Sequence, residues 1–352
     1  DMQTLKPIDD LIKWVKFSGA SWYNDGFFYS AYGKPKEGSA FSASNEYQKV
    51  YYHKIGTAQE EDKLIYEDKE HAKRGHYAWV TEDKEYLILG GSEGTSGNIV
   101  SFSKISSGLD DIGFTPLDTS FKTDERIIDH IDGRFLMMTN YKAENYRLVW
   151  VDPKSAASSQ WQDCIPEKDY VLEGVSRAGD HIICKYLKDV ETKLEVYDRK
   201  GQYLYDVALP GPGIASNMSG DIDQDYAYFS FTSYVQPGTA YEYDFKTRSY
   251  KVYFSPEVEF DPKEFESKKV FYQSKDGTSI PMFITYKKGI ELDGSNPTFL
   301  YGYGGFQISV RPHFHVRNVA FMEQGGIYAV ANLRGGLEYG EAWHKSGMLL
   351  NK

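Results

Sequence analysis

The sequence predicts a β-propeller of four-stranded blades, about five of them, followed by the opening strands of an α/β domain. Two observations support this fold class. Strand-like segments recur every 46–49 residues through the first three quarters of the chain, beginning at positions 50, 99, 148, 194 and 240. The repeat then stops, and two apolar segments follow with a helix-compatible segment between them. The repeat is typical of propeller blades, and the apolar segments are typical of an α/β sheet covered on both faces.

Each repeat contains a second strand-like segment upstream of the first. These segments cover residues 27–32, 86–89, 134–138, 181–184 and 226–231. Turn-forming residues precede most of them, and both sets are rich in aromatic and β-branched side chains. Another type of all-β fold is the alternative, but the narrow range of spacings favours blades. Helical and leucine-rich solenoids do not fit the pattern.

A polar, proline-containing passage at residues 255–262 ends the periodic region and is typical of a linker. We therefore expect two domains, 1–257 and 258–352. In the second domain, the Asp276–Gly277 pair predicts a hairpin turn between strands. The apolar segments 298–303 and 327–332 predict two further strands, with a helix near 316–324 between them.

Composition limits the classes of function. The chain has 40 basic and 51 acidic residues, a net charge of −11 and no run rich in Lys or Arg. This charge argues against nucleic acid or an anionic membrane surface as a partner. No apolar segment approaches the roughly 20 residues that span a membrane, and no signal-peptide pattern opens the chain. We expect a cytoplasmic protein, with the periplasm as the alternative because Asp1 need not be the natural start.

Cys164 and Cys184 are the only cysteines. Two cysteines are too few for a disulfide scaffold in a chain of this length, and each stands beside apolar residues. We expect reduced thiols.

Glycine-rich segments follow the two apolar strands, at residues 299–306 and 327–340. Glycines at such positions allow backbone to approach a ligand closely. Together with residues 275–283 and 338–345, these segments closely resemble the prolyl oligopeptidase family of serine peptidases. Shorter matches upstream, at 15–18, 51–53, 145–147 and 231–233, extend the resemblance over nearly the whole chain.

The resemblance implies a seven-bladed propeller that caps an α/β-hydrolase domain. In that family the serine nucleophile, the aspartate and the histidine come later in the chain than the segments matched here, in the usual order of the fold. We therefore expect the catalytic triad to lie beyond Lys352, so that this chain alone lacks it. No cofactor is implied.

The resemblance also assigns roles to three aromatic residues. Tyr303 matches the tyrosine that donates its phenolic O–H to the oxyanion of the tetrahedral intermediate. Phe306 and Phe17 match aromatic side chains that line the substrate pocket, where the flat apolar ring of proline binds. The alternative for all three is a place in the core. Gly75 and Thr95 depart from the family pattern, so subsite preference is not carried over.

Three other motifs suggest sites that we do not favour. Ser92 lies in a G-x-S-x-G sequence, but a strand rather than a helix follows it, which indicates a hairpin turn instead of a nucleophile elbow. His313 and His315 would share one face of a strand, yet no third ligand has a clear spacing, so we expect no metal site. Arg334, with Glu338 and Glu341 nearby in sequence, could bind a peptide carboxylate, but we expect it to anchor its loop.

The sequence therefore predicts that the parent protein is a serine endopeptidase that cleaves short peptides after proline and is monomeric. A peptidase of the same fold that cuts after basic residues or releases dipeptides is one alternative, although Phe306 favours proline. The other alternative is an inactive propeller that binds peptides or proteins.

Overall fold

The computed structural model describes residues 3–8 and 10–351. By its internal contacts the chain divides into two compact units. The first comprises Asp1–Tyr141 and Leu148–Asp163, and the second comprises Lys142–Arg147 and Cys164–Lys352. The predicted domain boundary near Glu257 concerns a different division of the chain and stays a prediction.

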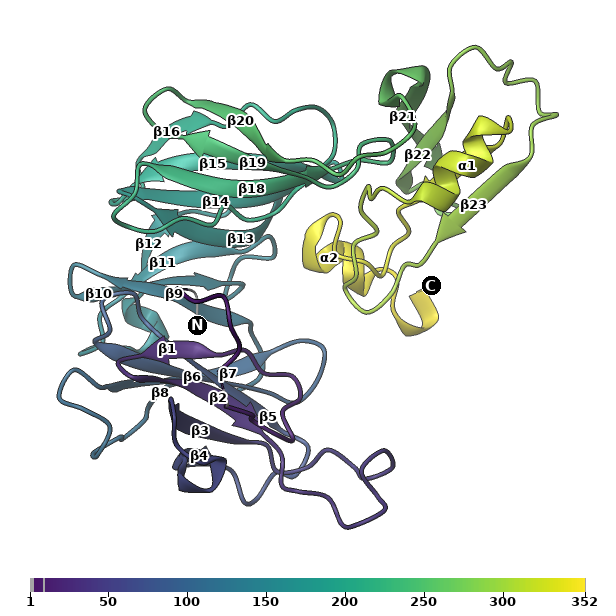
Figure 1. Cartoon of the computed structure of the whole chain (residues 1–352). Coiled ribbons are helices and arrows are strands. Elements are labelled where there is room, and N and C mark those ends of the chain that lie inside the picture. The colour runs from purple at the N-terminus through teal and green to yellow at the C-terminus, as the bar shows by residue number, and fades with distance from the viewer. Residues whose placement is uncertain (1–2, 9, 352) are drawn as a thin grey trace. The chain divides into compact units, whose positions relative to one another are not determined.

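Two four-stranded antiparallel sheets in the first unit have the orders β1-β2-β3-β4 and β5-β6-β7-β8 (Figure 1). Their strands are β1 (Ser21–Tyr23), β2 (Gly26–Ala31), β3 (Lys49–Lys54), β4 (Lys63–Glu67), β5 (Gly75–Val80), β6 (Tyr86–Ser92), β7 (Asn98–Lys104) and β8 (Thr115–Asp118). A short 3-10 turn, η1 (Gln59–Glu61), precedes β4.

Three more sheets of the same kind follow along the chain, with the orders β12-β11-β10-β9, β13-β14-β15-β16 and β17-β18-β19-β20. Their elements are β9 (Glu125–Ile131), β10 (Arg134–Thr139), β11 (Arg147–Val151), η2 (Ser158–Gln160), β12 (Gln162–Ile165), β13 (Val171–Ala178), β14 (His181–Lys188), β15 (Glu191–Asp198), β16 (Tyr203–Asp206), β17 (Ile214–Ala215), β18 (Tyr226–Thr232), β19 (Thr239–Asp244) and β20 (Ser249–Phe254).

These five sheets confirm the predicted propeller blades. The upstream segments of the sequence repeat form the second strand of each sheet, and the segments that set the 46–49 residue spacing form the third strand. The two middle strands of a blade are its most apolar, which explains why the sequence revealed them most clearly.

Apolar side chains pack neighbouring sheets together. Within the first unit, Phe28 and Leu87 belong to a buried cluster contributed by the first two sheets. Within the second unit, Leu194 and Phe229 belong to a larger cluster contributed by β13–β16 and β17–β20. Face-to-face packing of this kind gives each blade its core on both sides of the sheet.

A sixth sheet, of order β21-β22-β24-β23, lies in the second unit. Its elements are η3 (Pro262–Glu264), β21 (Phe265–Gln273), β22 (Ser279–Lys287), β23 (Thr298–Gly302), α1 (Val316–Glu323), β24 (Ile327–Ala331), α2 (Gly340–Lys345) and η4 (Leu349–Asn351). β23 and β24 are parallel, while β21 and β22 form the predicted hairpin. This arrangement confirms the predicted opening of an α/β domain.

β23 differs from the expectation of a sheet covered on both faces. Its five residues are all exposed, whereas β24 is largely buried. The reason is position: β23 is the edge strand and pairs only with β24 among the described residues. Helix α1 packs through Val319 and Met322 with Phe265 of β21 and Tyr328 of β24.

The tight turn between β14 and β15 is unusual. Asp189 and Val190 have φ of +50° and +65°, and such values are rare for a β-branched residue. The Val190 side chain is fully buried, in a cluster with Tyr234, Phe283 and Val330. A hairpin of one blade is therefore inserted into the core of the sixth sheet.

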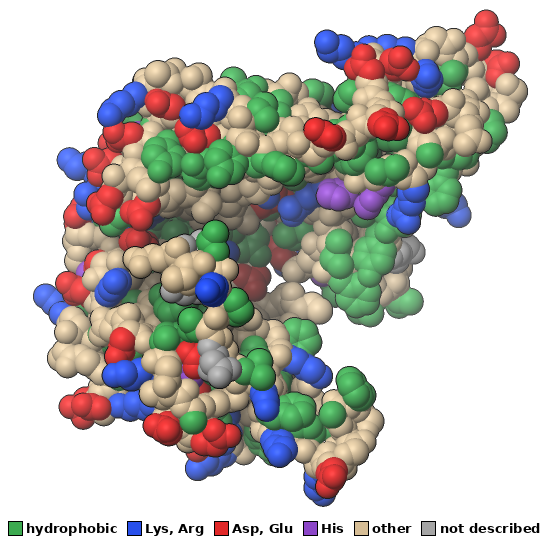
Figure 2. Space-filling view, viewed as in Figure 1, with side chains coloured by type: hydrophobic (Ala, Val, Ile, Leu, Met, Phe, Trp, Pro, Cys, Tyr) green, Lys and Arg blue, Asp and Glu red, His purple; other side chains and the backbone are tan. Residues whose placement is uncertain are grey.

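Acidic and basic side chains are interspersed on the face seen in Figure 2, which agrees with the absence of a basic run in the sequence. Among the described residues, no helix is long and apolar enough to cross a membrane.

Candidate active site

The chain turns sharply at Gly304, just after β23. Gly304 has a φ of +64°, and a Cβ at this position would lie 2.7 Å from the Arg334 carbonyl oxygen and from Leu333 Cβ. Only glycine fits these two constraints. Phe306 and Gln307 also have positive φ values, +54° and +59°, which cost energy for residues with a side chain. The turn must therefore be held by its surroundings.

The glycine loop after β24 supplies part of that support. Gly335 has a φ of +100°, and a Cβ there would lie only 2.4 Å from the Gly304 carbonyl oxygen. The backbone N–H of Gln307 donates to the Gly335 carbonyl, at 3.2 Å. The two glycine-rich segments thus approach each other backbone to backbone, whereas the sequence suggested that their glycines serve a ligand.

Two buried polar side chains fix the next part of the turn. The Val310 N–H donates to Glu338 Oε1 at 3.0 Å, and Asn332 Nδ2 donates to the Val310 carbonyl at 2.5 Å. Glu338 is almost fully buried, and this burial raises its pKa. Gln307 Nε2 also donates to Glu341 Oε1, at 3.0 Å. We call residues 303–311, which these contacts hold, the aromatic loop.

Arg334 anchors its own loop, but through partners that the sequence did not indicate. Its guanidinium lies 2.5 Å from Asp276 Oδ2 and also donates to Thr278 and Ser274 in the β21–β22 turn. Hydrogen bonds from Thr278 and Arg334 lower the pKa of Asp276 to about 2. Glu338 and Glu341, which follow Arg334 closely in sequence, hold the aromatic loop instead.

Tyr303 and Phe306 lie outside the core. Their exposed fractions are 43% and 66%, and their ring centroids are 6.4 Å apart. Within the described part of the chain, the Tyr303 hydroxyl has no hydrogen-bond partner. The aromatic loop therefore presents one phenol and one apolar ring to solvent from a rigidly held backbone.

Phe17 lies in the first unit and is also exposed. Its exposed fraction is 81% and its φ is +55°. This exposure is not what a core phenylalanine would show, because burial normally removes most of the ring from solvent.

Ser92 ends strand β6 and pairs with Asn98 of β7. No helix follows it, so the predicted hairpin turn is confirmed and a nucleophile elbow is excluded. Gly90 and Gly91 of the motif are needed for packing, since a Cβ at either would lie within 2.7 Å of the Tyr77 or Ile99 side chain.

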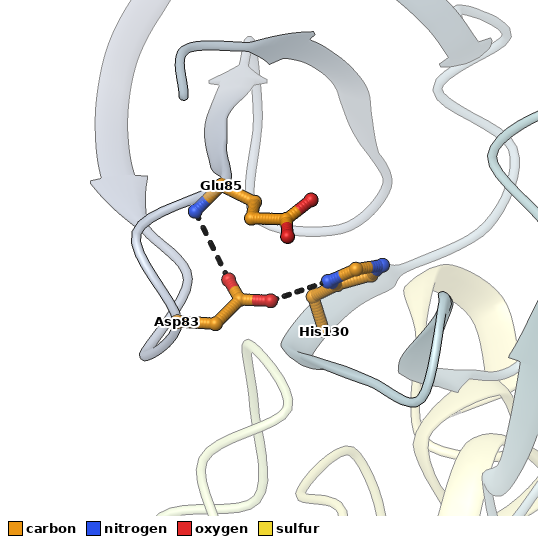
Figure 3. A group of neighbouring side chains, drawn as sticks. All are labelled: Asp83, Glu85 and His130. Carbon is orange, nitrogen blue, oxygen red and sulfur yellow. Dashed lines mark hydrogen bonds and ion pairs between the residues drawn. The ribbon is translucent and has the colours of Figure 1, made fainter. Parts of the chain in front are cut away.

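His313 and His315 do not lie in a strand, because residues 311–315 have no regular secondary structure, although their ring centroids are 4.9 Å apart. In residues 3–8 and 10–351 the only group of three side chains with metal-ligand spacing is a different one, Asp83, Glu85 and His130 (Figure 3). No motif in the sequence indicated this group. Its atoms are already paired: Asp83 Oδ2 lies 2.5 Å from His130 Nδ1, and Lys104 Nζ lies 3.5 Å from Glu85. We interpret it as a hydrogen-bonded link between two hairpins.

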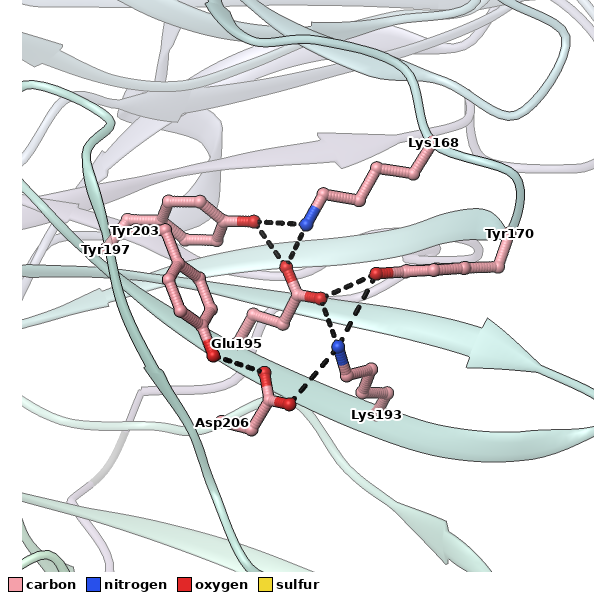
Figure 4. Close-up of polar contacts among 7 residues, drawn as sticks. All are labelled: Lys168, Tyr170, Lys193, Glu195, Tyr197, Tyr203 and Asp206. Atoms are coloured by element: carbon pink, nitrogen blue, oxygen red, sulfur yellow. Dashed lines mark hydrogen bonds and ion pairs between the residues drawn. The ribbon is translucent and has the colours of Figure 1, made fainter.

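A second polar cluster lies in the β13–β16 sheet and centres on Glu195 (Figure 4). The Glu195 carboxylate is 1% exposed and accepts hydrogen bonds from Lys168, Lys193, Tyr170 and Tyr197. Burial alone would raise its pKa, but these four donors outweigh burial and lower the pKa to about 2. A carboxylate that is charged and satisfied in this way is suited to stability and not to proton transfer.

Comparisons with known proteins all match this chain to one family. Residues 1–256 match the family described as the N-terminal β-propeller domain of prolyl oligopeptidase, and residues 312–352 match the prolyl oligopeptidase family. A prolyl endopeptidase of Elizabethkingia meningoseptica is 41% identical over 100% of this chain and 50% of its own length. One from Dictyostelium discoideum is 35% identical over 98% and 49%. The chain thus spans about half the length of the curated relatives it matches.

Solved structures give the same result. A structure from a study of two prolyl endopeptidases superimposes with a TM-score of 0.89 at 32% identity, covering 97% of this chain and 50% of that one. Prolyl oligopeptidase B from Galerina marginata, bound to a 25-residue macrocyclization substrate, gives a TM-score of 0.88 at 32% identity, with 96% and 48% covered.

Proposed function

This chain belongs to the prolyl oligopeptidase family, and from that premise we propose that it is the central part of a serine endopeptidase that cleaves short peptides on the carboxyl side of proline. The proposed domains are a partial propeller, 1–257, and the start of an α/β-hydrolase domain, 258–352. The end of the propeller match at residue 256 supports this boundary. The nucleophilic serine, the aspartate and the histidine are supplied by sequence after Lys352.

The observation that carries the proposal is the exposure of Tyr303 on a rigidly held loop. An oxyanion donor must have its hydroxyl unoccupied and its backbone fixed before the substrate arrives, because reorganisation during the reaction would cost energy. Tyr303 has a solvent-exposed phenol, and Gly304 and Gly335 lock the adjacent backbone. In the proposed mechanism this phenol and one backbone N–H stabilise the oxyanion while serine attacks and histidine shuttles the proton.

Phe306 is proposed to contact the proline of the substrate, and Phe17, in the first unit, is separately proposed as a substrate-binding residue on the family resemblance. Proline has a flat apolar ring and no backbone N–H, so aromatic surfaces recognise it better than hydrogen-bond acceptors do. Both side chains are exposed, as a residue that meets a ligand must be. The proposed substrates are short proline-containing peptides, and the parent protein is proposed to be monomeric and cytoplasmic, with no nucleic acid or membrane partner.

The test is hydrolysis of a succinylated Gly-Pro chromogenic peptide by the full-length protein, beside the matched peptide with arginine in place of proline. We expect turnover after proline only. Preference for arginine would favour the related specificity instead. Absence of turnover on either peptide, with a correctly folded protein, would reject the peptidase proposal and leave a peptide-binding propeller.

A further inference from the structure

A salt bridge joins the aromatic loop to the blade formed by β13–β16. Arg311 Nη2, at the end of the loop, lies 2.5 Å from Glu173 Oε1 on β13. The two residues are 138 positions apart in the sequence, and both belong to the second unit. The Glu173 side chain is 7% exposed and that of Arg311 is 38% exposed, so the contact is shielded on the side of the blade.

Glu173 is aimed at Arg311 by an irregularity in its strand. β13 pairs with β14 through Leu172 and Gly174, but the register shifts between them, so that Glu173 is the extra residue of a β-bulge. Bulges often re-aim one side chain and are common beside functional sites. A Cβ at Gly174 would lie 2.5 Å from the Asn217 amide oxygen, so a larger residue there would have to displace the Asn217 side chain.

A second cation lies on the opposite side of the carboxylate. Lys185 Nζ, from β14, is 3.4 Å from Glu173 Oε2, and its side chain is 11% exposed. Burial lowers the pKa of Lys185, and the charge of Arg311 adds to this effect while Glu173 opposes it. One carboxylate therefore separates two cations that would otherwise repel each other.

The loop transmits this contact toward Phe306. Between Phe306 and Arg311, the backbone N–H groups of Gln307, Ile308 and Val310 each donate a hydrogen bond, to Gly335, Gly305 and Glu338 respectively. Three of the four residues between Phe306 and Arg311 thus have their amides hydrogen-bonded, so this segment has little conformational freedom. A displacement of Arg311 must therefore strain or break the contacts that hold Phe306.

We propose that Arg311 is a positioning residue that fixes the aromatic loop against the β13–β16 blade. It does so through its salt bridge to Glu173, the bulge residue, which Lys185 also contacts. The blade thereby sets the placement of Tyr303 and Phe306. The effect on catalysis rests on the proposed function, whereas the effect on loop order does not.

The order of the three charges gives the proposal a specific signature. Glu173→Gln removes the one negative charge of these three and leaves the charges of Lys185 and Arg311 to repel each other. Removing Lys185 as well, in Glu173→Gln/Lys185→Met, relieves the repulsion and should restore much of the loop order. Arg311→Gln leaves Glu173 paired with Lys185. Adding Lys185→Met to this variant should further reduce the order of the aromatic loop, because Glu173 then becomes an unpaired buried charge.

Hydrogen exchange measured by mass spectrometry on the full-length protein tests this pattern. In Glu173→Gln, the amides of residues 307–311 should exchange about tenfold faster, the loss expected for one charge-assisted contact, and Lys185→Met should reverse most of that change. The matched control is Asp225→Asn, which breaks an exposed pair with Lys246 and should leave these amides unchanged. Equal exchange in wild type and Glu173→Gln, or no rescue by Lys185→Met, would overturn the proposal.

Kinetics of the full-length protein on the Gly-Pro peptide separate the two levels of inference. If wild type turns over, Glu173→Gln should lower kcat/KM about tenfold, Lys185→Met should restore it, and Asp225→Asn should not change it. If wild type does not turn over, the proposed function fails while the exchange signature still decides the role of Arg311. Normal turnover in Glu173→Gln alongside faster exchange would show that the salt bridge orders the loop without positioning the site.

Discussion

The Glu195 cluster and the aromatic loop both contain tyrosine, yet the tyrosine hydroxyls are in opposite states. Around Glu195, Tyr170 and Tyr197 donate to one buried carboxylate whose hydrogen-bonding capacity is filled. In the aromatic loop, Tyr303 is exposed and has an unoccupied hydroxyl. A polar side chain that is available for chemistry therefore combines two features: its backbone is held in place, and its functional group has no hydrogen-bond partner within the described protein.

The largest effect expected from this contrast is on stability. Glu195→Gln leaves Lys168 and Lys193 without their shared anion, so the free energy of unfolding should fall by about 3–5 kcal/mol, the usual cost of breaking a buried ion pair. Urea denaturation followed by circular dichroism measures it. Asp225→Asn, at an exposed ion pair, should cost less than about 1 kcal/mol. A Glu195→Gln protein as stable as wild type would show that the cluster is dispensable.

The next effect is on activity alone. Tyr303→Phe in the full-length protein should lower kcat on the Gly-Pro peptide by about 10² to 10³, the typical loss for one oxyanion donor, and should leave the unfolding free energy unchanged. Tyr197→Phe should do the reverse, lowering stability while kcat is preserved. If the two substitutions had the same profile, the distinction between the two regions would fail.

A third substitution tests whether the loop is held by its glycines. Gly335→Ala places a Cβ 2.4 Å from the Gly304 carbonyl oxygen, whereas Gly289, which has a similar φ of +89°, has no atom within 4 Å of the same position. Both alanines adopt a strained φ, but only the first also meets a clash. Gly335→Ala should therefore destabilise the chain by about 1–3 kcal/mol more than Gly289→Ala. Equal melting of the two variants would remove the argument for a glycine-locked loop.

The smallest expected effect is a dependence of the free energy of unfolding on pH. The pKa of Glu195 in the folded chain is about 2, below the value of about 4.3 for a free glutamate. Its stabilisation is thus present above about pH 4.3 and is lost as the pH falls toward 2. The gap in unfolding free energy between wild type and Glu195→Gln should narrow from pH 5 to pH 3. A gap that stayed constant over this range would mean that Glu195 has an ordinary pKa.

The sequence revealed the middle strands of the blades and not their edges. β3, β7 and β11 combine apolar side chains with a regular spacing, so periodicity identifies them. β16 and β17 are exposed or only two residues long, and their pairing is decided by neighbouring strands. The short helix α2 was also missed, since six residues give too little periodicity.

For the candidate site, resemblance located the residues but not their support. Tyr303 and Phe306 were identified from the glycine motif. The partner of Arg334, in contrast, is Asp276, 58 positions upstream, and Glu173 meets Arg311 across 138 positions. Contacts of this kind depend on tertiary packing, which leaves no local pattern in the chain. The exposure of β23 was missed for the same reason, because an apolar strand has the same composition at an edge as in the centre.

Two structural requirements restrict which residue can occupy position 190: a positive φ and an apolar side chain. The turn between β14 and β15 would accept glycine or asparagine most easily, because its φ is +65°, whereas the surrounding core of Tyr234, Phe283 and Val330 requires an apolar branch. No common amino acid satisfies both demands fully. Related sequences that change this position should therefore change its apolar neighbours as well, so the pair of positions 190 and 283 is a place to look for coupled substitutions.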